Sequence, residues 1–182
     1  MSIGDSPTVD SGSFRDRDGR IYRIDDRILR GVSDKALENF KQLQTTGFYA
    51  DGLERGRLVR SELVARDDLP LPPAEADRWA GFIEHERIPC ITYPYEWTFG
   101  MLKDAALLQL DLVEAAILEG MTLKDATPYN VQFVFGRPVF IDIASFEKLP
   151  EGAPWAGYRQ FCEMFLFPLM LQAYKGIDFQ PL

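Results

Sequence analysis

Two short β-rich runs within residues 121–147 constrain the fold of this chain more than any other feature. The runs cover residues 131–135 and 138–143, and Gly136-Arg137 lies between them. A glycine followed by one further residue suits a tight two-residue turn between antiparallel strands. The segment therefore predicts a β-hairpin with its turn at Gly136-Arg137.

The hairpin predicts where three polar side chains lie. With that turn, Asn130 faces Ile143 and Val131 faces Asp142, because the numbers of cross-strand partners sum to about 273. Asn130 and Asp142 are then side by side at the open end, with Cα atoms roughly 5 Å apart. Asp125 lies on the loop that leads into the same end. Three oxygen-bearing side chains at one edge suit a hard cation such as Mg²⁺.

This order of residues resembles the catalytic segment of the protein-kinase-like fold, including its aminoglycoside-phosphotransferase branch. There an Asp, four residues, an Asn, a hairpin and a second Asp follow one another. The resemblance implies that Asp125 orients or deprotonates an acceptor hydroxyl and that Asn130 and Asp142 hold Mg²⁺ on the phosphates of ATP. Two positions differ from the family pattern: Leu123 replaces a His, and Ile143-Ala144-Ser145 follows Asp142 in place of Phe-Gly.

A purely structural interpretation of the same three residues stays open. Asp125 could cap a turn, Asn130 could occupy a left-handed loop position, and Asp142 could be a solvated strand end. An Asp and an Asn five positions apart are common in unrelated proteins. The combination with a hairpin and a preceding helix favours the kinase-like interpretation.

The chain also resembles a narrower family over most of residues 15–180. The segments TYPYEWTFGMLKDAALLQLD and PWAGYRQFCEMFL, with residues 121–147 between them, are similar to the N-terminal portion of bacterial class I SAM-dependent methyltransferases, some of them nodulation-related. That portion precedes the methyltransferase domain proper. No glycine-rich turn that could hold SAM occurs here. SAM would therefore bind only through a domain absent from this chain.

The predicted fold class is α+β, a protein-kinase-like two-lobed fold with a truncated C-terminal lobe. Residues 1–14 form a disordered leader, 15–92 an N-lobe of strands plus one helix, 93–99 a hinge, and 100–182 a partial helical C-lobe with the hairpin. Ser33 caps a helix over residues 34–44, and Thr98 caps one over residues 100–119 that Gly120 closes. Residues 52–64 are expected to form a turn entering a strand, and residues 74–82 a short helix.

The predicted N-lobe lacks two features of nucleotide-binding kinases. No Gly-x-Gly occurs in the chain, so there is no recognisable glycine loop over phosphates. Its lysines, Lys35 and Lys41, fall on the predicted helix rather than on a strand. Arg30 or Arg60 could replace the lysine that pairs with phosphate, although each could equally be a strand-surface arginine.

Two further charged residues have the same ambiguity. Glu38 on the predicted helix could be the acidic partner of the phosphate-pairing residue, or part of a solvated helix face. Lys124, beside Asp125, could offset phosphate charge, or be an ordinary surface lysine. We place Lys124, Arg30 and Arg60 together as candidate cofactor-binding residues.

Composition limits the classes of partner. The formal net charge is −8, which disfavours non-specific nucleic-acid binding. The two cysteines, Cys90 and Cys162, form no disulfide framework, which fits a reducing cytoplasm. No apolar run is clean enough to cross a bilayer, so no membrane partner is expected.

The last predicted helix, over residues 155–174, is almost continuously apolar. A helix that is apolar on all sides is buried or covered by a partner. A full kinase-like lower lobe also needs more helices than this chain supplies. We expect the chain to be a fragment, with a methyltransferase domain or another partner covering that helix.

Three functions fit these features. The first is a kinase-like region that binds nucleotide and Mg²⁺ ahead of a methyltransferase and assists modification of a small-molecule substrate. The second is a small-molecule phosphotransferase. The third is an inert scaffold that holds a partner; the presence of Asp125, Asn130 and Asp142 together disfavours it.

Overall fold

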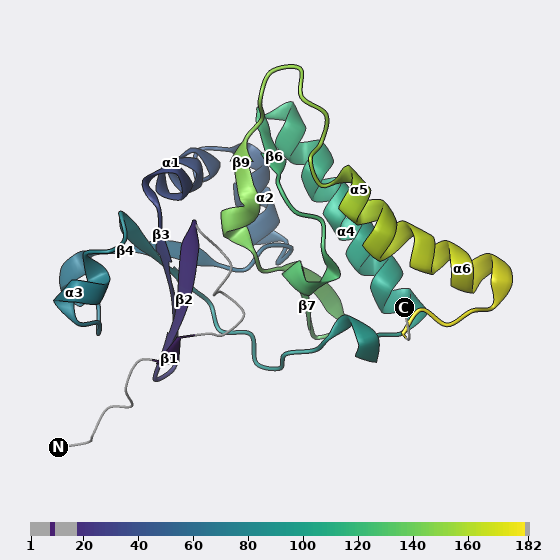
Figure 1. Ribbon diagram of the computed structural model, residues 1–182, viewed down its shortest axis with the longest axis horizontal. Coiled ribbons are helices and arrows are strands. Elements are labelled where there is room, and N and C mark those ends of the chain that lie inside the picture. Colours follow the sequence, from purple (N-terminus) through teal and green to yellow (C-terminus); the bar gives the residue numbers. More distant parts are fainter. Residues whose placement is uncertain (1–7, 10–17, 181–182) are drawn as a thin grey trace. The chain divides into compact units, whose positions relative to one another are not determined.

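The computed structural model describes residues 8–9 and 18–180, which form a mixed α/β structure (Figure 1). The chain divides into two compact units. Unit 1 contains the described residues of Met1–Lys41 together with Arg60–Arg87, and unit 2 contains those of Gln42–Val59 and Ile88–Leu182. The predicted leader, residues 1–14, lies almost wholly outside the described residues. The predicted lobe boundary at residue 92 falls inside unit 2, as does the segment 42–59.

Unit 1 is built on an antiparallel five-stranded sheet with the order β1-β2-β3-β5-β4. Its strands are β1 (Thr8–Val9), β2 (Gly19–Ile24), β3 (Arg27–Val32), β4 (Ser61–Val64) and β5 (Gly81–His85). Asp25, with a φ of 52°, reverses the chain between β2 and β3.

One hydrophobic cluster of unit 1 lies on one face of this sheet. Tyr22, Leu29 and Phe82 are almost completely buried and cluster with partly buried Trp79. The Tyr22 hydroxyl donates to Glu75 Oε1 at 2.5 Å and accepts from Trp79 Nε1 at 2.8 Å. Burying the phenol therefore leaves neither its donor nor its acceptor unsatisfied.

The predicted helix over residues 74–82 is wrong at its C-terminal end. The helix α3 covers only Pro73–Ala76. Residues from Gly81 onward instead pair with β3 and β4 as the strand β5. Their backbone groups are satisfied across the sheet, so the chain leaves the helix before Gly81.

The helix α1 (Asp34–Leu43) confirms the helix predicted over residues 34–44. Its cap is as expected, because Ala36 N donates to Ser33 Oγ at 3.3 Å. A second helix, α2 (Gly47–Glu54), was not predicted; residues 52–54 end this helix and do not begin a turn. Two glycines in eight residues weaken its intrinsic helix propensity, and its stabilising contacts are with residues distant in sequence.

The longest helix, α4 (Phe99–Leu118), also agrees with its prediction. Met101 N donates to Thr98 Oγ1 at 3.3 Å, the expected N-cap contact. Gly120 follows the helix with a φ of 75°, a left-handed conformation that glycine adopts without strain. The stripe facing the core of unit 2 contains Leu102, Ala105, Ala106, Leu108, Leu112, Val113 and Ala116.

Four short strands follow α4. β6 (Met121–Leu123) pairs with β9 (Phe146–Lys148), and β7 (Val131–Val134) pairs with β8 (Arg137–Phe140). Segments more than twenty residues apart in sequence therefore lie side by side as β6 and β9 in Figure 1. The loops between these strands contain the three candidate residues of the predicted metal site.

The hairpin β7–β8 is present, but its predicted turn and register are wrong. Phe135 and Gly136 have φ values of 50° and 76°, and positive φ at both central residues defines the preferred two-residue turn. The turn therefore begins one residue earlier than predicted. Val131 pairs with Phe140, and Ile141 N donates to Asn130 O at 2.8 Å. Asn130 thus lies opposite Ile141, not Ile143.

The C-terminal helical stretch is interrupted. It consists of α5 (Tyr158–Phe161), the π-helical segment η6 (Cys162–Leu166) and α6 (Phe167–Lys175). The π-helical segment ends two residues before Pro168, whose missing N–H interrupts the regular backbone ladder. Phe161 and Phe165 are buried, whereas the outward face is apolar and exposed. Among the described residues, no helix combines the length and hydropathy that a bilayer crossing requires.

Candidate functional site

The loop that holds Asp125 is fixed through its backbone. Gln109 of α4, which is fully buried, donates from Nε2 to Asp125 O at 3.1 Å. Trp155 Nε1 donates to Leu123 O at 2.8 Å. Ala126 N donates to Gln160 Oε1 at 2.8 Å. Three backbone groups within residues 123–126 are therefore hydrogen-bonded to side chains from other elements, which fixes the loop conformation.

Lys124 lies on the same loop and is half-buried. Its backbone N donates to Ser145 O at 3.0 Å. This contact joins the loop to the short 3-10 helix η5 (Ile143–Ser145), which follows Asp142. The loop before Asn130 and the turn after β8 are consequently neighbours at their backbones.

Asn130 and Asp142 lie at the same end of the hairpin. Asn130 ends the 3-10 helix η4 (Pro128–Asn130) directly before β7. Asp142 follows Ile141, the residue that hydrogen-bonds to the Asn130 carbonyl. Both side chains are half-buried, as is that of Asp125. The corrected register therefore still brings Asn130 and Asp142 to the open end of the hairpin.

The side-chain oxygens of Asn130 and Asp142 suit a metal ion that takes most of its ligands from outside the protein. Within the described part of the chain, no group of three or more His, Cys, Asp or Glu side chains could enclose a metal ion. Asn130 and Asp142 offer one amide and one carboxylate. Mg²⁺ bound to a nucleotide needs few protein ligands, because phosphates and waters complete its octahedron. The buried Asn130 Nδ2 has no hydrogen-bond partner, which leaves the amide orientation free to suit a ligand.

The segment before α4 is held against the hairpin by one side chain. Gln132 of β7 is 5% exposed. Its Oε1 accepts from Thr92 N at 2.8 Å, and its Nε2 donates to Thr92 O at 3.0 Å. Trp97 Nε1 in turn donates to Thr92 Oγ1 at 3.0 Å. The predicted hinge, residues 93–99, is thus anchored at both of its ends.

Exposed aromatic rings lie within that anchored segment. Tyr93 and Tyr95 stack with ring centroids 5.4 Å apart and an interplanar angle of 3°. Desolvation raises the pKa of Tyr95, and the nearby charges of Glu96, Tyr93 and Tyr129 raise it further. Tyr129 directly precedes Asn130 in the chain.

The two candidate arginines belong to unit 1. Arg30 lies on β3, between Ile21 of β2 and Ile83 of β5, and is only 8% exposed. Arg60 precedes β4 and is exposed, with its carbonyl accepting from Glu86 N at 2.8 Å. Burial distinguishes Arg30 from an ordinary surface arginine. Because the buried guanidinium stays charged, Arg30 is the stronger of the two candidates.

The residues that position the site were not predicted from the sequence. Gln109, Gln132, Trp155 and Gln160 contribute no candidate ligand, yet they hold the loops that do. The sequence contains a pattern that points to two of them. Gln109 interrupts the apolar stripe of α4, and Gln132 interrupts the apolar run of β7. A polar residue in a buried stripe requires a hydrogen-bond partner.

Comparison with known proteins gives one informative similarity. No family model matches the chain. Over 167 residues the chain is 39% identical to "Nodulation protein NoeA" of Rhizobium meliloti (strain 1021). The match covers 90% of this chain and 33% of NoeA. The chain therefore spans about a third of the length of this curated relative.

Proposed function

We propose that this chain is a kinase-like region that binds a Mg²⁺–nucleotide at the open end of the β7–β8 hairpin. The observation that carries the proposal is the pairing of Asn130 with Ile141, which brings an amide and the Asp142 carboxylate to one edge. The fixed loop of Asp125 adjoins that edge through the contact between Lys124 and Ser145.

The order of elements supports the same proposal. A five-stranded antiparallel sheet receives one long helix, α1, after its third strand. A linker, the long helix α4, a short strand, a polar loop and a hairpin then follow. This is the order expected from the kinase-like resemblance, with a buried charged residue, Arg30, on the third strand.

The candidate residues of unit 2 have defined roles in this proposal. Asn130 and Asp142 supply oxygen ligands, and Asp125 orients the hydroxyl of a small-molecule acceptor. Bound Mg²⁺ would neutralise part of the charge on the nucleotide phosphates. Lys124 adds positive charge beside Asp125. Arg30 and Arg60 belong to unit 1, and their predicted contact with phosphate stays a prediction. We further propose that this region assists substrate modification in a larger methyltransferase-type protein, as the sequence resemblance implies.

Thermal unfolding in the presence of nucleotide tests the proposal. ATP with Mg²⁺ should raise the Tm of the chain, because a ligand that binds only the native state stabilises it by mass action. At a concentration of 100 times the Kd, the gain in unfolding free energy is about 2.7 kcal/mol. The absence of any shift up to millimolar ATP with Mg²⁺ would contradict the proposal.

Three variants separate the roles. Asp142→Asn should abolish the Mg²⁺-dependent part of the Tm shift, because it removes a charged ligand at nearly constant volume. Asp125→Asn should leave the shift unchanged and stop any turnover. Glu114→Gln, which removes an exposed carboxylate of α4, should behave as wild type. An unchanged response of Asp142→Asn would exclude its metal role.

A second candidate function, docking to another domain, has its own observation. The C-terminal helices expose a set of large apolar side chains: Tyr158, Leu166, Phe167, Met170, Tyr174 and Ile177. Exposed apolar side chains gathered on one stretch of helix are typical of a contact with another protein surface. We propose that a methyltransferase-type domain of a longer protein covers it.

Binding to the remainder of the relative tests this docking role. The part of NoeA that the chain does not match, produced separately, should bind the chain in calorimetry. Phe167→Ser combined with Met170→Ser should weaken binding at least about tenfold. Leu118→Ser, which alters an 81% exposed leucine at the end of α4, should not. Equal affinity of the two variants would exclude the helix face as the docking surface.

A further inference from the structure

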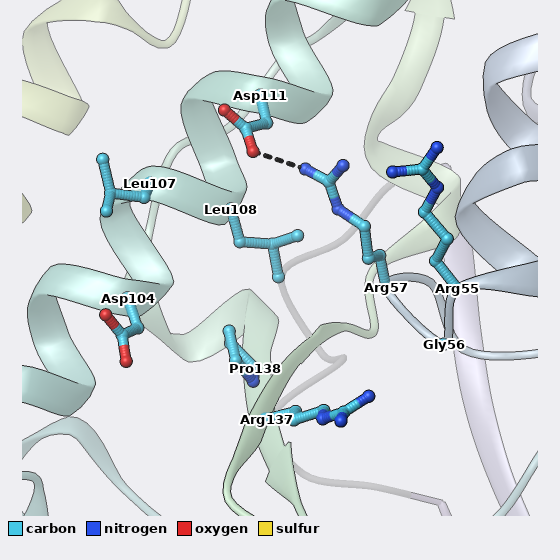
Figure 2. Close-up of a pocket in the computed structure, with 9 residues that line it drawn as sticks. All are labelled: Arg55, Gly56, Arg57, Asp104, Leu107, Leu108, Asp111, Arg137 and Pro138. Carbon is cyan, nitrogen blue, oxygen red and sulfur yellow. Dashed lines mark hydrogen bonds and ion pairs between the residues drawn. The ribbon is translucent and has the colours of Figure 1, made fainter.

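A hollow of about 300 Å³ lies at the turn end of the β7–β8 hairpin, the end opposite to Asn130 and Asp142. Three elements surround it: α4, the loop after α2, and the first residues of β8 (Figure 2). The residues that line it are Arg55, Gly56, Arg57, Asp104, Leu107, Leu108, Asp111, Arg137 and Pro138. All of them belong to unit 2.

Backbone contacts fix these walls relative to one another. Leu58 forms a parallel bridge with Phe140. Val59 N donates to Phe140 O, and Phe140 N donates to Arg57 O, both at 2.9 Å. The loop that holds two of the arginines is therefore an extension of the β8 ladder. Such a wall is pre-formed, which lowers the entropic cost of binding a ligand.

The side chains on the two sides of the hollow are also joined. Arg57 Nη2 donates to Asp111 Oδ2 at 2.7 Å, which links the loop to α4. Gly56, with a φ of 65°, allows the reversal that brings Arg55 and Arg57 to the same side of the loop. Figure 2 shows these two guanidinium groups side by side above the hollow.

The charge of the lining differs in sign from that of the chain. The whole chain carries −8, but three arginines and two aspartates line this hollow. Asp111 is engaged by Arg57, and Figure 2 shows Asp104 at the far edge, away from Arg55. Arg55 donates from Nε to Asp51 Oδ1 at 2.8 Å, and Asp51 does not line the hollow, so a ligand in the hollow meets the Nη groups of Arg55. Arg137 is exposed and forms no ion pair with any residue that the structure describes. The arginine side of the hollow therefore attracts an anion.

Apart from Asp104, the opposite side of the hollow is apolar. Leu107 is 52% exposed although it is a large aliphatic residue on α4. Leu108 and Pro138 continue this surface toward Arg137 (Figure 2). Ligand pockets in proteins are typically apolar with a few polar groups that orient the ligand. Guanidinium groups orient carboxylates and phosphates by paired hydrogen bonds.

We propose that this hollow binds a small organic oxyanion, a carboxylate or phosphate with an apolar group attached. The oxyanion lies toward Arg55 and Arg57, and the apolar group lies over Leu107 and Pro138. Arg137 adds long-range attraction from the other edge. The site is separate from the candidate metal site, because the full length of β8 lies between Arg137 and Asp142.

Titration of the full chain with phenyl phosphate, benzoate and inorganic phosphate tests this site. Phenyl phosphate should shift the methyl NMR signals of Leu107 and Leu108 and bind at least about tenfold more tightly than inorganic phosphate. Raising the salt concentration should weaken binding, because the arginines are exposed. Benzoate should bind if the site accepts carboxylates as well as phosphates, and its failure would restrict the class to phosphates.

Arginine variants locate the binding. Arg55→Ala combined with Arg137→Ala should weaken phenyl phosphate at least about tenfold, whereas Arg159→Ala, at an exposed arginine of α5 paired with Glu163, should not. Both altered side chains are exposed, so circular dichroism should report an unchanged fold. Equal weakening by Arg159→Ala, or equal affinity for inorganic and phenyl phosphate, would overturn the proposal.

The proposals for the metal site and for the hollow can be tested independently of each other. Asp142→Asn should leave phenyl phosphate binding unchanged, since it alters only the metal site. The arginine double variant should retain the Mg²⁺-dependent part of the response to ATP. Loss of phenyl phosphate binding in Asp142→Asn would show that one site accounts for both observations and would remove the separate hollow.

Discussion

At the scale of single residues, buried side-chain amides take the place of missing backbone partners. Gln132 forms two hydrogen bonds with the backbone of Thr92, as a neighbouring strand would. Gln109 completes the hydrogen bonding of the loop that holds Asp125. These residues bind no ligand, but they determine where the candidate ligands lie.

The hydrogen bonds between Gln132 and Thr92 should contribute to the stability of the fold. Gln132→Leu should lower the free energy of unfolding by about 1–3 kcal/mol, because the N–H and C=O groups of half-buried Thr92 lose their hydrogen-bond partners. Urea denaturation measures the change. Gln44→Leu, at an exposed position of the segment after α1, should change stability by less than about 0.5 kcal/mol. Similar effects of both variants would contradict the anchoring role.

A second residue-scale prediction concerns pH. Paired hydrogen bonds from Arg27, at 2.9 and 2.7 Å, lower the pKa of Glu84 below its ordinary value of 4.5. The unfolded chain therefore binds a proton at a higher pH than the folded chain does. The stabilisation is complete above the unfolded pKa and is lost as pH falls through the lower folded pKa.

Comparing variants at two pH values measures this contribution. Glu84→Gln should be less stable than wild type at pH 7, by no more than about 1 kcal/mol because the pair is a third exposed. The difference should shrink toward pH 3. Glu86→Gln, at an exposed glutamate two residues away, should show no such change with pH. A difference that persists undiminished at pH 3 would exclude the ion pair as its cause.

At the scale of elements, α2 depends on a carboxylate that is distant in sequence. Glu119 Oε2 accepts from Gly47 N and Glu119 Oε1 accepts from Phe48 N, both at 2.7 Å. The residue at the cap position itself, Thr46, makes no capping contact and instead donates to Leu43 O. A negative charge at a helix N-terminus also interacts favourably with the helix dipole.

Removing that carboxylate should weaken α2. Glu119→Ala should lower the unfolding free energy by about 0.5–2 kcal/mol, the usual range for a lost N-cap. Hydrogen exchange of the Gly47 and Phe48 amides should accelerate more than that of amides in α4. Glu114→Ala on the exposed face of α4 serves as the control. Unchanged protection of Gly47 and Phe48 would rule out this cap.

The same contact explains which elements the sequence could predict. α1 and α4 combine a local cap with an apolar stripe, so both were predicted to within one or two residues. α2 has its cap 72 residues away, which no local pattern contains. The hairpin turn was misplaced because Phe135 adopts a positive φ that bulky residues rarely take.

At the scale of the whole molecule, each unit has its own aromatic core. Tyr22 and Phe82 pack in unit 1, with ring centroids 6.1 Å apart. Phe48, Phe140 and Phe146 pack in unit 2. The sequence indicated the mixture of helices and antiparallel strands and the residues of the candidate site. It did not indicate that residues 42–59 belong with the C-terminal half, because that depends on the pairing of Leu58 with Phe140.

The hydrogen bonds to the Asp125 loop have a practical consequence for protein engineering. Its carbonyl and amide groups are matched by Gln109, Trp155 and Gln160, which come from separate elements. A peptide of these few residues, grafted onto another scaffold, would lack all three of these hydrogen-bonding side chains. The loop therefore cannot be transferred by itself, and any graft must include the middle of α4 and the beginning of the C-terminal helices.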